Sequence, residues 1–184
     1  MTEVGPRDIL DFWLKDTPSD KWFASDPAID SEIRSRFETV WRRGCAGGLS
    51  DWENERNGAL ALIILFDQFP RNMFRGMADA FASDALAREI AKRSIARARD
   101  LEVPASVRFF FYMPLMHSED LADQNSCVHL IKERLVDDDS THRFALMHRG
   151  AIERFGRFPA RNAALGRPNT QDEQDFLNLN PRGF

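Results

Sequence analysis

The chain has 184 residues and a formal net charge of −4, with 43 % hydrophobic and 29 % charged residues. This composition is typical of one globular domain and excludes a disordered chain. Because a basic surplus is missing, it also argues against a nucleic-acid-binding protein.

Three further features bear on where the protein works. Cys45 and Cys127 form neither a zinc pattern nor a disulfide framework. The N-terminus lacks the basic and apolar regions of a signal peptide, and the longest apolar run, residues 59–66, is too short to span a bilayer. We therefore expect a soluble, cytoplasmic protein that does not bind membranes and carries no cofactor.

Apolar residues recur with the helical period of 3.6 along nearly the whole chain, and no stretch alternates with the period of a strand. The expected helices start at Pro6 and run over about 26–44, 52–68, 83–99, 104–114, 118–136 and 141–155, with a short one after Thr170. About eight helices without strands predict an all-α fold of antiparallel helical hairpins. We expect one helical domain over 1–184, with about the last six residues forming a tail.

Several helix ends are marked by capping residues. Asp26 before Pro27 predicts a helix start, and Thr170 with Glu173 forms a capping box. Gly156 suits a C-terminal stop. The phrases DQFPRN (67–72) and RFPARN (157–162) resemble each other, and we expect the proline of each to end a helix.

Polar residues interrupt the apolar stripe of the helix expected over 118–136. The stripe runs through Leu121, Val128, Ile131 and Leu135, and its backward extension by helical spacing passes through Gln124, Asp120 and His117. A polar or charged group that faces a core costs several kcal/mol unless it is paired. These side chains therefore predict polar partners opposite them.

The helix expected over 141–155 has the same feature. Its predicted buried stripe contains Phe144, Met147, Ala151 and Phe155, and His148 lies within it. The central helix ends in Asp67 and Gln68 directly after an apolar run, and arginines and asparagines follow in both FP phrases. These residues together predict one polar cluster. The candidate ligand-binding residues are Asp67, Gln68, Arg71, Asn72, Arg75, His117, Glu119, Asp120, Gln124, His148, Arg157, Arg161 and Asn162.

Two interpretations of this cluster remain open. In the first, Asp67, Glu119 and Asp120 pair with arginines in a buried ion-pair network that fixes how helices meet. In the second, arginines and asparagines line a pocket for an anionic or carboxylate-bearing ligand, because the guanidinium fork binds planar anions in two places at once. The expected partner is then a small anion or an acidic peptide.

The motifs DQFPRNMFRG, HSEDLADQ and RFGRFPARNAALGR resemble the bacterial family known as domain of unknown function 924. DILDFW, KWFASDPAIDSEIRSRF and LALIILFDQFP are also similar to it, so the resemblance covers roughly residues 7–178. It implies a tetratricopeptide-like, right-handed helical array and no established activity. The family often has a histidine between the proline and arginine of the last motif, where this chain has Ala160.

Three classes of function fit these residues. A helical binding protein with the polar pocket is favoured over a protein-interaction scaffold in which the ion pairs are purely structural. A hydrolase that uses His117, Asp120 and His148 on a phosphate or acyl substrate is the enzymatic alternative, but no nucleophile motif accompanies it. A metal site on these residues lacks the HExxH and paired ExxH spacings, so we expect none.

Overall fold

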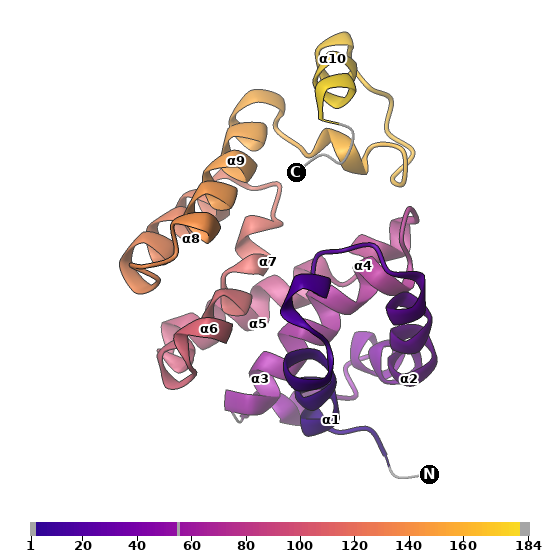
Figure 1. Ribbon diagram of the computed structural model, residues 1–184, viewed down its shortest axis with the longest axis vertical. Coiled ribbons are helices and arrows are strands. Elements are labelled where there is room, and N and C mark those ends of the chain that lie inside the picture. Colours follow the sequence, from indigo (N-terminus) through magenta and orange to yellow (C-terminus); the bar gives the residue numbers. More distant parts are fainter. Residues whose placement is uncertain (1–2, 55, 181–184) are drawn as a thin grey trace. The chain divides into compact units, whose positions relative to one another are not determined.

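The structure is a computed structural model that describes residues 3–54 and 56–180. Within these ranges the chain forms helices and turns and no strand, which confirms the predicted all-α class (Figure 1). The α-helices are α1 (Pro6–Asp11), α2 (Pro27–Cys45), α3 (Arg56–Ile63), α4 (Phe69–Met73), α5 (Asp84–Ala96), α6 (Ala105–Arg108), α7 (Met113–Met116), α8 (Leu121–Arg134), α9 (Asp139–Phe155) and α10 (Gln171–Leu179).

Short π-helical and 3-10 segments connect and extend these helices. The π-helical segments are η1 (Phe12–Asp16) and η4 (Ile64–Gln68). The 3-10 segments are η2 (Ser19–Lys21), η3 (Ser50–Asn54), η5 (Ala78–Phe81), η6 (Arg99–Glu102), η7 (Phe109–Phe111) and η8 (Pro159–Arg161). They divide several of the longer helices that the apolar period predicts.

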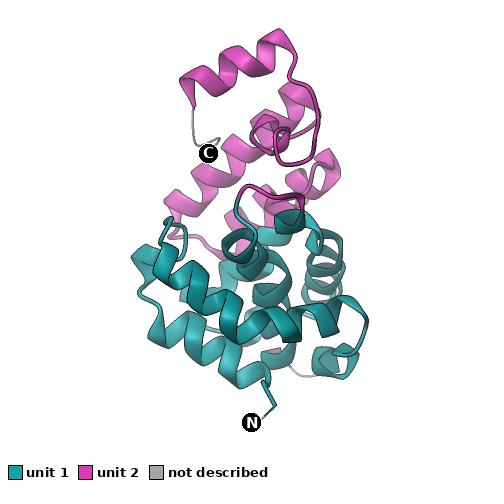
Figure 2. Cartoon of the chain, turned by 90° about the vertical axis from the view of Figure 1, so that its right-hand side faces the viewer, with its two compact units in different colours: residues 1–75, 79–114 teal, residues 76–78, 115–184 magenta. Residues whose placement is uncertain are grey.

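The chain divides into two compact units (Figure 2). The first unit comprises residues 1–75 and 79–114, and the second comprises residues 76–78 and 115–184. The single domain and the tetratricopeptide-like arrangement stay predictions, and the last four residues of the expected tail lie outside the described residues.

The first unit is built around α3, which continues through η4 into α4. Residues 59–66 are at most 3 % exposed, so the eight-residue apolar run is the buried centre that its composition predicts. Helices α1 and α5 pack against α3, and α2 packs against α4. Rings of Phe12, Phe37 and Phe69 meet at centroid distances of 4.8–6.0 Å, which ties α2, η1 and α4 together.

The expectation that Pro70 ends this central helix is wrong. The Phe69 N–H bonds to the carbonyl of Ile64, five residues back, so the helix widens into a π-turn and then continues to Met73. Pro70 lies in the first turn of α4, where its missing N–H is not needed. Pro114 lies in the first turn of α7 for the same reason and opens that short helix instead of breaking a longer one.

The second unit contains α8 and α9 packed side by side, followed by η8 and α10. Helix α8 starts at Leu121, with Asp120 as its N-cap, and not at Ser118 as predicted. Helix α9 ends at Phe155, and Gly156 adopts φ 69°, which confirms the predicted stop. The Thr170–Glu173 capping box at the start of α10 is also confirmed.

The predicted buried stripe of α9 is partly wrong. Phe144 and Met147 are 48 % and 45 % exposed, whereas Ala145, Ala151 and Ile152 are buried. The buried face of α9 therefore includes two small side chains, Ala145 and Ala151, and such side chains let helices approach closely. Among the residues that the structure describes, we find no helix with the length and apolarity needed to cross a membrane.

Candidate functional site

The predicted site residues fall into two groups, one in each unit. Asp67, Gln68, Arg71, Asn72 and Arg75 belong to the first unit. His117, Glu119, Asp120, Gln124, His148, Arg157, Arg161 and Asn162 belong to the second unit.

In the first unit the group starts within the π-helical segment η4. Asp67 is 0 % exposed and Gln68 is 4 % exposed. The Gln68 amide donates to the Asp67 carboxylate, and its nitrogen lies 3.5 Å from the sulfur of Met113. Burial of a carboxylate requires such donors, since an isolated buried charge would be strongly unfavourable.

Arg71 is the main cationic partner of these carboxylates. Its two terminal nitrogens bond to the two oxygens of Asp84 at 3.0 and 3.1 Å, and one lies 3.5 Å from Asp67. It also donates to the backbone carbonyl of Asp67. Burial would lower the pKa of Arg71, but the charges of Asp67 and Asp84 outweigh this and raise it. Arg71 thus links the end of η4 to the start of α5.

The rest of the first phrase also contributes to the fold. Arg75 binds both oxygens of Asp30 on α2, at 3.0 and 2.8 Å. Asn72 is buried at 8 % exposure. The two arginines of this region therefore join α4 to α5 and to α2.

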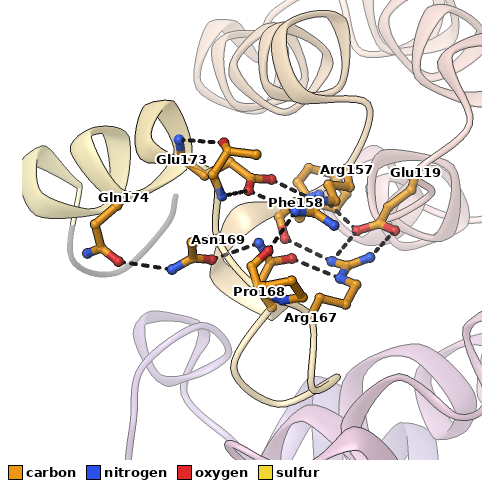
Figure 3. Close-up of polar contacts among 10 residues, drawn as sticks. Glu119, Arg157, Phe158, Arg167, Pro168, Asn169, Glu173 and Gln174 are labelled. Carbon is orange, nitrogen blue, oxygen red and sulfur yellow. Dashed lines mark hydrogen bonds and ion pairs between the residues drawn. The ribbon is translucent and has the colours of Figure 1, made fainter.

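In the second unit, Glu119 is a central acceptor (Figure 3). Arg167 binds its two oxygens at 2.8 and 3.0 Å, and the Phe158 N–H donates to it at 2.8 Å. Burial would raise the pKa of Glu119, but these bonds and the charges of Arg167 and Arg161 lower it. Arg167 was not among the predicted site residues, because it lies outside the repeated phrase. Its place in the motif RFGRFPARNAALGR was the available signal.

Arg157 forms the second bidentate pair of this unit (Figure 3). It binds the two oxygens of Glu173 at 2.6 and 2.8 Å, and Glu173 is only 2 % exposed. Arg157, together with the Thr170 N–H, lowers the pKa of Glu173 to about 2. Asn162 bonds to Asn169 and accepts from Arg167, each at 2.8 Å. This network fastens α10 and its loop to the RFPARN turn.

The two candidate histidines are neighbours. The ring centroids of His117 and His148 lie 6.1 Å apart, and the ring of Phe158 lies edge-on to His148 at 5.6 Å. The Nδ1 of His148 bonds to the carbonyl of Phe144 on its own helix. Arg161 donates to the carbonyl of His117 at 2.8 Å and lies over the ring of Phe158. The fold therefore places both imidazoles beside the second FP phrase.

Asp120 does not face the core as predicted. It is exposed, and its side chain accepts from the Ala122 N–H at 2.7 Å, because the N-terminus of α8 needs a cap. Gln124 is buried as predicted and donates to the carbonyls of Met116 and Ser118, on either side of His117. These bonds fix the backbone that carries His117.

The chemistry of Ser118 is that of a turn residue. Its hydroxyl donates to Asp123 at 2.7 Å and accepts from the Asp120 N–H at 3.2 Å. Such bonds order the loop before a helix. Among residues 3–54 and 56–180, no group of three or more His, Cys, Asp and Glu side chains is arranged to hold a metal ion.

A groove of about 510 Å³ in the first unit was not predicted. It runs along α1 and η1 where α1 packs against α3. The lining residues are Pro6, Arg7, Leu10, Asp11, Leu14, Lys15 and Asn57. Apolar residues 6, 10 and 14 and charged residues 7, 11 and 15 form two adjacent rows at spacings of four, and this pattern was the available signal.

The charges of the groove are not balanced. Asp11 lies 3.4 Å from Arg7 and 2.5 Å from Lys15, so one carboxylate serves two cations. The hydrogen bond from Lys15 is the main cause of a lowered pKa for Asp11. Arg7 and Lys15 are 89 % and 66 % exposed, so they keep donors for another anion.

The chain is similar to a known family and to a solved structure. A family described as bacterial protein of unknown function (DUF924) matches residues 9–180. A solved structure of a protein of unknown function, ATU0120 from Agrobacterium tumefaciens, is 40 % identical and superimposes with a TM-score of 0.89. This match covers 95 % of the present chain and 97 % of the other. No curated protein matches the sequence.

Proposed function

The chain belongs to the DUF924 family of bacterial proteins, and from this premise we propose that it is a helical binding protein for an anionic or carboxylate-bearing ligand. The observation that carries the proposal is the groove along α1. Its volume of about 510 Å³ lies within the range of small-molecule sites. Its lining holds two cations and one carboxylate, so its charge of +1 attracts an anion although the whole chain carries −4.

This proposal places the ligand away from the two repeated FP phrases of the sequence. Arg71, Arg75 and Arg157 each bind both oxygens of a carboxylate in their own unit. A guanidinium that already binds both oxygens of a protein carboxylate has fewer hydrogen-bond donors left for a ligand. The ion pairs of these phrases therefore support a structural role, and the α1 groove is the better candidate for the pocket.

The hydrolase alternative has less support. It needs His117, Asp120 and His148 to act on one substrate, but Asp120 caps α8 and accepts from a backbone N–H. Ser118 donates to Asp123. A general base has to reach the proton that it removes, and the bond of Asp120 to the Ala122 N–H occupies this carboxylate as a helix cap.

The test is a binding experiment on the full chain. Sodium salts of small carboxylates, phosphate esters and short acidic peptides are titrated at constant ionic strength, since screening weakens surface electrostatics. We expect one class of anion to raise the melting temperature, and we expect the double variant Arg7→Gln/Lys15→Gln to lose that shift. A matched control, Lys132→Gln on α8, removes an exposed cation from the other unit and keeps the shift.

Two results would overturn the proposal. One is the absence of any shift across the anion set. The other is a shift of equal size in wild type and in Arg7→Gln/Lys15→Gln, which would place the anion elsewhere. Both substituted side chains are largely exposed, so the double variant is expected to fold normally.

A further inference from the structure

The apolar residues that line the α1 groove indicate what the uncharged part of its ligand is. Pro6, Leu10 and Leu14 are each half-buried, so their remaining surface is available for contact. They follow one another at spacings of four residues on the same side of the helix. This row is a continuous apolar strip, and Arg7, Asp11 and Lys15 run parallel to it.

The length of the strip limits the size of its occupant. Residues 6 to 14 cover eight helical steps, the last of them in the π-helical segment η1, so the strip is at most about 12 Å long at the α-helical rise. A compact anion such as phosphate or acetate would use one cation and leave the apolar row in contact with water. An elongated apolar chain would cover it, and burial of apolar surface is favourable in proportion to the area removed from water.

We propose that the groove binds an amphipathic carboxylate, with an unbranched apolar chain along Pro6, Leu10 and Leu14 and its carboxylate on Lys15 or Arg7. This inference rests on the proposed function and names its ligand class. The cations lie at the two ends of the charged row with Asp11 between them. A single terminal carboxylate fits this arrangement, because a second one near the middle would meet the like charge of Asp11.

The chain-length dependence of binding tests the inference. Acetate, hexanoate, octanoate, decanoate and dodecanoate are titrated into the full chain by isothermal calorimetry, below their micelle concentrations. We expect the affinity to rise by up to about fourfold per methylene, as follows from about 0.8 kcal/mol per buried CH₂. The rise should level off near decanoate, whose extended length is similar to that of the strip.

Side-chain variants separate the apolar and charged contributions. We expect Leu14→Ser to flatten the dependence on chain length, whereas Leu86→Ser, which alters an exposed leucine of α5, should leave it unchanged. Arg7→Gln/Lys15→Gln should weaken the binding of every carboxylate of the series by a similar factor, and Lys132→Gln should weaken none. Circular dichroism checks that Leu14→Ser is folded, and if it is not, the chain-length series of the wild type still tests the apolar contribution.

Head-group controls complete the design. Decanol and decyltrimethylammonium carry the same chain without a carboxylate, and we expect both to bind at least tenfold more weakly than decanoate. Equal binding of decanol would overturn the role of the cations. If acetate binds as tightly as decanoate through Lys15, the inference fails while the proposed function stands. If no carboxylate of the series binds, and the other anions do not bind either, both fail.

Discussion

The two FP phrases show how similar sequences act differently in the two units. In DQFPRN the proline follows a π-turn, and the helix continues through it to Met73. In RFPARN the proline follows Gly156, whose φ of 69° has already ended α9, and it opens the 3-10 segment η8. The first phrase thus lies within a buried helix, whereas the second forms a turn between two helices.

The difference shows what a proline-arginine-asparagine phrase contributes. In the first unit, Arg71 links the end of η4 to α5 through Asp84. In the second unit, Arg157 links the turn to α10 through Glu173. Arg71 directly follows its proline and Arg157 precedes its proline by two residues, and each joins its phrase to a carboxylate of a later helix. The two phrases therefore share an arginine–carboxylate pair to a later helix, whereas their backbone conformations differ.

The largest effect is expected for Arg71→Met in the first unit. The variant leaves Asp67, which is fully buried, and Asp84 without their guanidinium partner. Loss of one partner from a buried ion pair typically costs about 3–5 kcal/mol. Urea unfolding of wild type and variant measures the difference. An unchanged or raised stability would contradict the structural role and would return the ligand to this phrase, since binding residues are often kept at a cost in stability.

A smaller effect is expected for Glu173→Gln in the second unit. The amide keeps the shape of the side chain but loses the charge-assisted bonds to Arg157 at 2.6 and 2.8 Å. Hydrogen bonds to charged groups contribute about 2 kcal/mol, and that is the expected loss. Asp172→Asn is the matched control, because this neighbour on α10 is 59 % exposed and its loss should be small. Equal losses of stability in the two variants would show that the buried Arg157–Glu173 pair contributes no more than the exposed Arg154–Asp172 pair.

The pH dependence of stability distinguishes charge from shape at Glu173. Its pKa is about 2 in the folded protein, below the ordinary value of about 4.3 in an unfolded chain. A group with a depressed folded pKa stabilises the fold above its unfolded pKa, and this contribution is lost as pH falls toward the folded value. The stability difference between wild type and Glu173→Gln should therefore be constant above about pH 5 and shrink from pH 4.3 toward 2. A difference that does not change over this range would contradict the assignment.

Local features of the fold could be predicted from the sequence, because they depend on a few neighbouring residues. The stop at Gly156 and the capping box of Thr170 and Glu173 are examples, since backbone hydrogen bonds and φ values decide them. The buried face of α9 could not be predicted, because Phe144 and Met147 fit the helical period as well as Ala145 and Ile152 do. The partner helix, which the period does not specify, selects among such faces.

The candidate site shows the same difference between local features, which the sequence predicts, and tertiary pairings, which it does not. The sequence identified Asp67 and Glu119 as acids that need cations, but it did not pair Arg71 with Asp84 or Arg167 with Glu119. These pairs join residues 13 and 48 positions apart, and only the tertiary fold determines them. The α1 groove was missed because its residues look like an ordinary amphipathic helix, and a groove also requires the neighbouring α3.

The smallest effect on stability is expected at Gly156, the glycine that ends α9 before the second phrase. Gly156 and Gly150 both lie at positions where an added Cβ would meet no atom within 4 Å, so packing does not separate them. Gly156 has a positive φ, and Gly150 lies inside α9. Gly156→Ala should therefore lose about 1 kcal/mol, because an L side chain is strained in the left-handed region. Gly150→Ala should gain about 0.5–1 kcal/mol from helix propensity. Urea unfolding of the two variants measures this opposite pair of shifts, and shifts of the same sign would mean that α9 does not end at the glycine that precedes RFPARN.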